Sequence, residues 1–274
     1  MRLKFLNTVL ICGFLTSTCL VNYANAGIIT NGLGGTADFG ENSLAANDDG
    51  SRLVDLSSVF TDGLDFFGNN YSSLYVNNNG NVTFNSSQST FTPIVLTGNT
   101  SNPIIAPFFA DVDTRGGATT ATANGNSTGS NLVYWDLDTA GNGIFTVTWD
   151  DVGYYNRNTS LLNAFQLQLI GAGNGDFDIK ITYESINWTT GDASSGSNGL
   201  GGTVARGGWS SGNGEFKEFS WSGNESEVLA LDTGNGSYTQ VRNGNAVIAQ
   251  VPEPSTLAIF ALGIMGLAAR RFKK

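Results

Sequence analysis

The 274-residue sequence contains no histidine, and its two cysteines, Cys12 and Cys19, both lie in an apolar stretch near the N-terminus. The rest of the chain can therefore form no disulfide, no His/Cys zinc site and no Ser-His-Asp or Cys-His catalytic group. Lysine is also scarce, because only Lys180 and Lys217 lie between the two terminal segments. The chemistry left to an enzyme is a pair of carboxylates or a serine with a lysine.

Positive charge is scarce throughout the body of the chain. Six of the 13 Lys and Arg residues lie in the two terminal segments, whereas all 23 Asp and Glu residues lie between Gly27 and Pro254. Binding to nucleic acid or anionic lipid needs clustered Lys and Arg, so this composition argues against both as partners. It fits a well-solvated secreted surface or association with divalent cations.

Long periodic runs of Ala, Leu, Glu and Lys are absent, whereas Gly accounts for 36 residues and Asn and Ser are abundant. Short alternating apolar segments recur about every ten residues, which is typical of strands joined by turns. The sequence thus predicts an all-β fold, an antiparallel β-sandwich with long Gly/Asn/Ser-rich loops. An N-terminal signal helix and a C-terminal hydrophobic helix are expected to flank it.

Three hairpins and one buried strand organise this prediction. The buried strand lies within residues 103–115, where Pro103 and Pro107 exclude a helix interior. Short closing strands are expected at 218–221 and 228–231, a flexible or variable loop at 119–130 and a linker at 235–250. The predicted hairpins pair segments within residues 71–84, 132–149 and 164–183.

The first 26 residues have the features of a signal peptide. A positive start precedes an apolar stretch, and Ala24-Asn25-Ala26 fits the small-x-small pattern before a cut. We expect signal peptidase to cleave between Ala26 and Gly27. A lipoprotein signal that acylates Cys19 is the alternative.

The C-terminus carries Pro252-Glu253-Pro254, a short apolar stretch and a basic end. As a helix, residues 257–269 would span only about 20 Å, less than a bilayer core of about 30 Å. This arrangement resembles the PEP-CTERM sorting signal of Gram-negative bacteria. The resemblance implies recognition and cleavage by an exosortase, with transient anchoring in the inner membrane. A permanent tail anchor is the alternative.

Several segments together resemble the nidogen-like (NIDO) domain. They include Phe66-Phe67-Gly68, the run from Leu74 to Phe84, the run from Pro103 to Arg115 and the strands around Trp149 and Phe165. We therefore divide the chain into a signal peptide (1–26), a lead-in segment (27–46), a nidogen-like β domain (47–234), a linker (235–250) and the sorting signal (251–274).

Asp111 and Asp113 are candidate calcium ligands. At positions i and i+2 of a strand their side chains point to the same side, where two carboxylates repel unless a cation or an arginine intervenes. An ion pair with Arg115 is the competing interpretation. No other cofactor is expected. Asp150/Asp151 and Asp176/Asp178 are further carboxylate pairs, and Trp149, Trp188, Trp209 and Trp221 are expected mainly in the core.

The nidogen-like resemblance implies a non-catalytic role in cell–matrix adhesion, and the sorting signal implies export to the surface or surroundings of a Gram-negative bacterium. Extracellular polysaccharide or a matrix protein would be the partner. A secreted hydrolase that acts on exopolysaccharide through paired Asp residues is the alternative. Self-association in the matrix is a third.

Overall fold

The computed structural model describes residues 28–231 and 236–247. The predicted signal peptide and sorting signal lie outside these residues, so the two expected terminal helices are not part of the described fold. Within the described ranges no helix has both the length and the apolar character needed to cross a bilayer.

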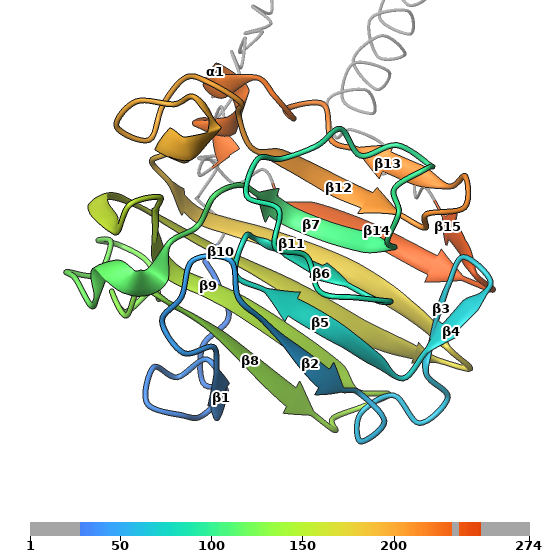
Figure 1. The fold of residues 1–274 in the computed structure, drawn as a ribbon. Helices are drawn as coiled ribbons and strands as arrows, with labels where there is room; N and C mark the ends of the chain where they lie inside the picture. Colours follow the sequence, from blue (N-terminus) through green and yellow to red (C-terminus); the bar gives the residue numbers. More distant parts are fainter. Residues whose placement is uncertain (1–27, 232–235, 248–274) are drawn as a thin grey trace, which may run out of the picture.

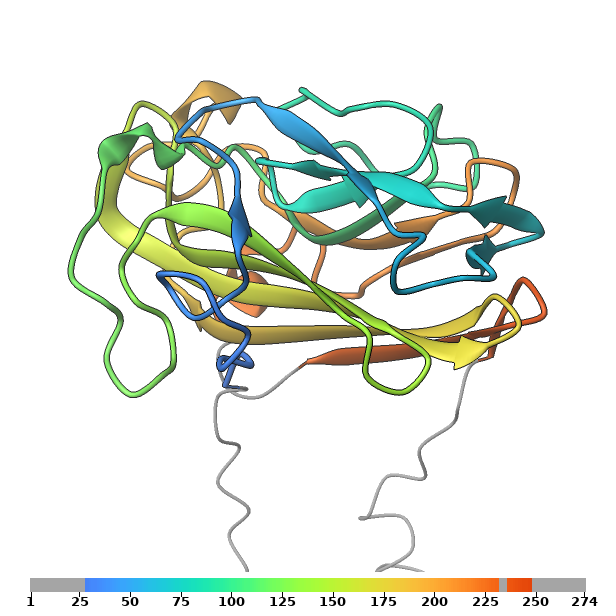
Figure 2. The same cartoon turned by 90° about the horizontal axis from the view of Figure 1, so that it is seen from below.

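Two antiparallel sheets stacked face to face form the molecule (Figures 1 and 2). The first sheet has seven strands in the order β1 (Asn42–Ser43), β8 (Leu132–Asp138), β9 (Ile144–Tyr154), β10 (Asn158–Gly173), β11 (Asp176–Ile186), β14 (Ser237–Arg242) and β15 (Asn245–Val247). The second has six, in the order β13 (Phe216–Glu218), β12 (Arg206–Ser210), β7 (Ile104–Phe109), β6 (Asn81–Thr83), β5 (Ser73–Asn77) and β2 (Ser51–Asp55). The predicted all-β antiparallel architecture is confirmed.

Short elements complete the described residues. A two-stranded sheet pairs β3 (Leu64–Phe66) with β4 (Asn69–Tyr71). Two 3-10 turns, η1 (Thr114–Gly116) and η2 (Asp192–Ser194), lie in loops, and one short helix, α1 (Glu225–Val228), follows β13. The closing strand expected at 228–231 is therefore wrong, since α1 covers its first residue.

The three predicted hairpins are confirmed as β5–β6, β8–β9 and β10–β11. Apolar and polar residues alternate along these strands, which explains the hairpins. Leu167 and Leu169 face the other sheet, whereas Gln166 and Gln168 lie on the opposite face of their own sheet. Gly80 lies in the β5–β6 turn with a φ of 72°. A Cβ there would approach Phe108 O to 1.8 Å, so this turn requires glycine.

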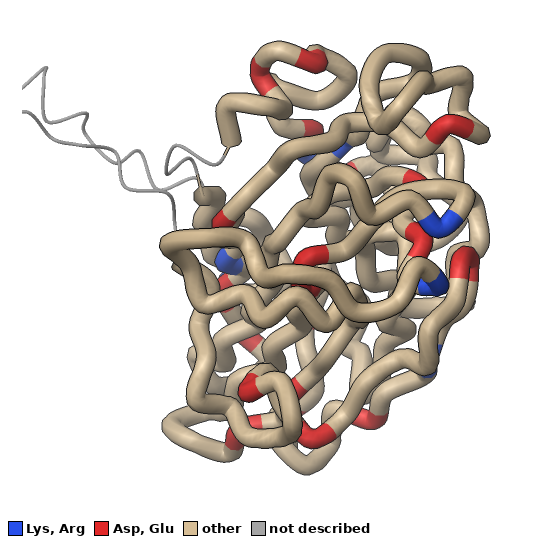
Figure 3. The backbone as a smooth tube through the Cα atoms, turned by 90° about the vertical axis from the view of Figure 1, so that its left-hand side faces the viewer, with Lys and Arg blue, Asp and Glu red and all other residues tan. Residues whose placement is uncertain are grey.

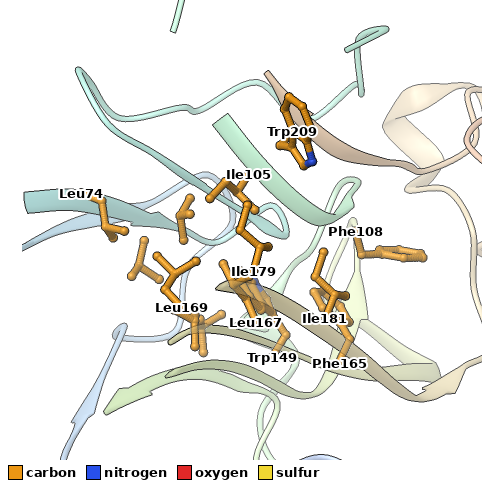
Figure 4. Packing of buried hydrophobic residues seen from close by; sticks show 14 of the residues in the cluster. Leu74, Ile105, Phe108, Trp149, Phe165, Leu167, Leu169, Ile179, Ile181 and Trp209 are labelled. Carbon is orange, nitrogen blue, oxygen red and sulfur yellow. The ribbon is translucent and has the colours of Figure 1, made fainter. Parts of the chain in front are cut away.

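The core lies between the sheets and centres on β7, whose six residues are all buried. Figure 4 shows Ile105 and Phe108 of β7 facing residues of β10 and β11. The Phe108 and Phe165 rings lie 5.3 Å apart, and Trp149 stacks on Phe165 at 4.9 Å. Each such side chain contributes about 1.5–3 kcal/mol by burial.

Pro107 lies inside a central strand, where a missing N–H normally disrupts the ladder. The register of β12 against β7 shifts between Arg206 and Gly208, opposite this proline. The bulge removes the need for a hydrogen bond at that position. The Pro107 carbonyl instead accepts from Tyr183 Oη across the core at 2.7 Å.

Two segments outside the predicted domain belong to the sandwich. Residues 235–250 were expected to be a linker, but β14 pairs with β11 and β15 with β14. In the lead-in segment β1 pairs with β8, and Ile29 and Phe39 are fully buried against Tyr134 and Ala164. The fold therefore extends on both sides of the predicted domain boundaries.

Candidate functional site

Three acidic or amide-rich segments meet at one end of the sandwich, and we call this group the acidic cluster. It comprises Asp48 and Asp49 before β2, Asn78 and Asn79 in the β5–β6 turn, and Asp111, Asp113 and Arg115 after β7. Figure 3 shows how sparse Lys and Arg are relative to Asp and Glu on one side of the molecule.

The two asparagines hold the acidic segments together. Asn78 Nδ2 donates to the carbonyls of Asp48 and Val112, each at 2.5 Å. Asn79 Nδ2 donates to Asp49 Oδ1 at 2.8 Å, and its Oδ1 accepts from Val112 N at 3.0 Å. Both asparagines are fully buried. Their contribution is the side-chain amide, since neither asparagine has a positive φ.

Asp113 forms the ion pair that the sequence offered as an alternative to calcium. Its Oδ1 accepts from Arg115 N and Nε, and its Oδ2 from an Arg115 terminal nitrogen at 2.6 Å and from Arg157 N at 2.8 Å. Burial acts to raise the pKa of Asp113, but these hydrogen bonds outweigh it and lower the pKa. Asp48 Oδ2 shares the same arginine at 2.8 Å.

Asp111 lies in a different environment although it is only two residues away. Its side chain is 1% exposed, and no donor among the described residues reaches its Oδ2. Burial, then repulsion from Asp48, Asp49 and Asp113, raises its pKa to about 7. The two predicted calcium ligands therefore differ: Asp113 accepts several hydrogen bonds, whereas Oδ2 of Asp111 has no donor among the described residues.

Asp48 shares this imbalance. Its Oδ1 is buried without a hydrogen-bond partner, while its Oδ2 contacts Arg115. Burial, followed by repulsion from Asp113, raises the pKa of Asp48 to about 6, although Arg115 acts in the opposite direction. Sequence reasoning did not select Asp48, since it lies 63 positions before Asp111 and only the fold joins them.

Asp150 and Asp151 hold the long loop that follows η1. Asp150 accepts from the backbone and hydroxyl groups of Thr128 and Ser130, and Asp151 accepts from Thr122 and Gly129 N. Glu184 accepts from the backbone N–H groups of Asn126 and Ser127. The loop expected to be flexible is thus hydrogen-bonded to three buried carboxylates.

The remaining candidates are mainly structural. Asp178 pairs with Arg242 at 2.6 Å, and Asp176 Oδ1 accepts from Asn243 N at 2.6 Å. Asp176 also lines a polar cavity of about 300 Å³ together with Asp62. The four tryptophans considered as candidates are buried in the main core, as expected. They are Trp149, Trp188, Trp209 and Trp221.

An apolar groove lies where the open edges of the two sheets meet, between β13 and the β14–β15 hairpin. Half-exposed Phe216, Tyr238 and Val247 line it, with Trp209 and Lys217 also in its wall. Its volume is about 330 Å³. A larger hollow of about 930 Å³ shares Lys217 and Tyr238 with it and continues along the same side. We call these two hollows the edge groove.

The described residues thus form an antiparallel β-sandwich in which several buried carboxylates accept hydrogen bonds from loops. The nidogen-like domain family matches residues 72–244, and a PEP-CTERM protein-sorting motif matches residues 250–274. The chain belongs to the nidogen-like domain family. It carries the sorting motif of exported proteins at its C-terminus.

Relatives with curated names support this assignment. Mouse alpha-tectorin is 37% identical over 160 residues, which is 54% of this chain and 7% of that protein. Chicken alpha-tectorin is 37% identical over 179 residues, 61% of this chain and 8% of its own length. Nidogen of Drosophila melanogaster is 28% identical over 186 residues, 62% of this chain and 13% of its own length. The chain thus spans a small part of each relative. No solved structure matches the chain.

Proposed function

We propose that this chain is a non-catalytic protein of the bacterial cell surface or extracellular matrix that acts by binding, in adhesion or in a biofilm matrix. The observation that carries this proposal is one chain with a nidogen-like domain at 72–244 and a sorting motif at 250–274. The sorting motif supports recognition by an exosortase. The nidogen-like domain supports a role in contact with a matrix.

The proposed export route makes two cuts in the chain. Signal peptidase would cut between Ala26 and Gly27, and the exosortase would cut near Pro252-Glu253-Pro254 after transient anchoring in the inner membrane. Mass spectrometry of the mature protein from a producing bacterium locates both ends. An intact mass that still includes residues 256–274 would contradict this route.

The edge groove is the surface that we propose for ligand contact. Phe216 and Tyr238 are 50% and 54% exposed, and they offer aromatic faces beside the edge strands. Trp209 is also in the groove wall, and its ring stacks on Phe67 at 4.6 Å, which fixes its position.

These features favour an extracellular polysaccharide as the ligand. Sugar rings present apolar C–H faces to aromatic side chains and hydroxyl oxygens to donors. Glu215, Lys217 and Asn245 in the groove wall supply further polar contacts. The acidic body would disfavour strongly anionic chains, so neutral or weakly charged polymers fit best.

A binding assay with two matched variants tests this function. Phe216→Ala should weaken binding of the mature protein to isolated matrix polysaccharide about tenfold, a loss of about 1.4 kcal/mol. Leu53→Ala is the control, because Leu53 is equally exposed at 51% but lies in β2 at the opposite edge of the same sheet. Equal binding by both variants and wild type would contradict the groove assignment.

The same samples test the hydrolase alternative. New reducing ends in the polysaccharide, lost in Asp176→Asn, would show catalysis and overturn the non-catalytic assignment. Asp176 is the carboxylate to change, because it lines the polar cavity whereas Asp111 is buried away from solvent. Binding without product supports the proposed function.

A further inference from the structure

Two carboxylate oxygens in the acidic cluster are buried without a partner, and this imbalance needs a physical explanation. They are Asp111 Oδ2 and Asp48 Oδ1. Asn78 Nδ2 joins the two segments that carry them, because it donates to the carbonyls of Asp48 and Val112. Buried polar atoms in native proteins are nearly always paired, and an exception commonly marks an ion or a water. A buried carboxylate without a counter-charge costs several kcal/mol.

The charges around these oxygens favour a cation. Asp48, Asp49, Asp111 and Asp113 face a single guanidinium, that of Arg115, within the cluster. Arg115 directs its hydrogen bonds to Asp113 and to the other oxygen of Asp48. Asp111 therefore gains little from the arginine, and the cluster retains excess negative charge.

We propose that Asp48 and Asp111 bind a calcium ion at this end of the sandwich, with Asp113 and Arg115 as a neighbouring ion pair. Ca²⁺ takes oxygen ligands from carboxylates, carbonyls and water in a flexible geometry, whereas Mg²⁺ demands near-ideal octahedral sites. Among the described residues no group of three or more acidic, imidazole or thiolate side chains could hold a metal. The proposed site therefore rests on the two unpartnered oxygens alone, and carbonyl oxygens and water would have to complete the coordination.

The two proposed ligands differ in their surroundings. The Asp48 side chain is 23% exposed and therefore has access to solvent. Asp111 packs on Gly191, where an added Cβ would lie 2.2 Å from Asp111 Cβ and 2.5 Å from its Oδ2. Asn78 and Asn79 fix the segments that carry the two carboxylates. This site is independent of the edge groove, so it goes beyond the proposed function and can fail separately.

Calcium titration of the mature protein tests the site directly. We expect Ca²⁺ to bind with a Kd of about 10⁻⁴–10⁻³ M, as in other extracellular modules. Addition of 10 mM CaCl₂ after EDTA treatment should raise Tm by roughly 5 °C, and MgCl₂ should have a much smaller effect. Terbium luminescence, sensitised by nearby aromatic residues and displaced by CaCl₂, gives a second readout.

Two variants make the test specific. Asp111→Asn should remain folded, with a Tm equal to or above that of the calcium-free wild type. Its Tm should no longer rise when CaCl₂ is added. Asp48→Asn should weaken Ca²⁺ binding at least tenfold. Asp136→Asn is the control, because Asp136 is a half-buried carboxylate in β8 whose pKa is also raised by burial. It should keep the full response.

Two results would overturn the proposal. One is the absence of heat and of a Tm shift when 10 mM CaCl₂ is added to wild type at pH 8. That result would mean that no calcium ion neutralises Asp111. The other is a calcium response retained in both Asp111→Asn and Asp48→Asn, which would place the ion elsewhere.

Discussion

Replacement of Asn78 by alanine should destabilise the protein strongly. Asn78 is fully buried, and its side-chain nitrogen satisfies the carbonyls of both Asp48 and Val112. Truncation leaves two acceptors without their donor, and each buried unsatisfied group costs about 1–3 kcal/mol. We expect a loss of about 2–5 kcal/mol in the free energy of unfolding.

The mature protein's tryptophans give a convenient assay. Trp149 donates from Nε1 to the Asn78 carbonyl at 2.9 Å, so its fluorescence reports on this turn. Urea unfolding in EDTA, with the m-value held as a check on two-state behaviour, measures the loss. Asn69→Ala is the control, since Asn69 is exposed in β4 and should change stability by less than about 0.5 kcal/mol.

A loss below about 1 kcal/mol for Asn78→Ala would refute the reasoning. It would mean that water replaces the amide at both carbonyls, and that the three segments of the acidic cluster are held by other contacts. Asn78→Asp gives an independent comparison. It keeps the shape of the side chain but removes the donor and adds a fifth carboxylate, so it should destabilise the protein further at pH 8 than at pH 5.

Two more predictions concern the same end of the molecule. Gly80→Ala should lower the free energy of unfolding by at least about 2 kcal/mol, because the added Cβ would clash with Phe108 O and because Gly80 has a positive φ. Gly141→Ala is the control and should cost about 1 kcal/mol, because Gly141 also has a positive φ but open space around the added Cβ. Equal losses in urea unfolding would argue against the clash. In EDTA the free energy of unfolding should fall as the pH rises from about 4 to 7. The pKa values of Asp111 and Asp48 are raised to about 7 and about 6 in the folded protein. In this pH range the folded state therefore holds protons that the unfolded chain has already released. We expect a fall of about 2 kcal/mol, which includes an allowance for solvent screening. Asp111→Asn should reduce this fall, and only the double variant Asp48→Asn/Asp111→Asn should give a flat profile.

Alternation along the strands made most of the sandwich predictable. The β10–β11 hairpin follows from apolar residues at every second position, and β7 from a dense apolar run. The β14–β15 hairpin was missed because Val241 is its only fully buried side chain. Its turn nevertheless carries a local signal, since Asn243 and Gly244 both adopt positive φ in a two-residue turn typical of hairpins.

The candidate site was less predictable because its members meet only in the folded chain. Local spacing correctly brought Asp113 and Arg115 together as an ion pair, and it placed Asp111 beside them. Local spacing could not identify Asp48, because this residue is far from Asp111 in the sequence and meets the cluster only in the folded chain. It also could not show that the Asn78 side-chain amide binds the Asp48 carbonyl, because the residues around Asn78 indicated only a turn. The loop at 119–130 was misjudged for the same reason, since Asp150, Asp151 and Glu184 hold it from later strands.

The position of β15 has a consequence for how the molecule would be displayed. The described chain ends at Val247, on the edge strand of the seven-stranded sheet (Figure 2). Val247 also lines the edge groove. Whatever is joined to the chain shortly after this strand would therefore be held close to the proposed binding surface.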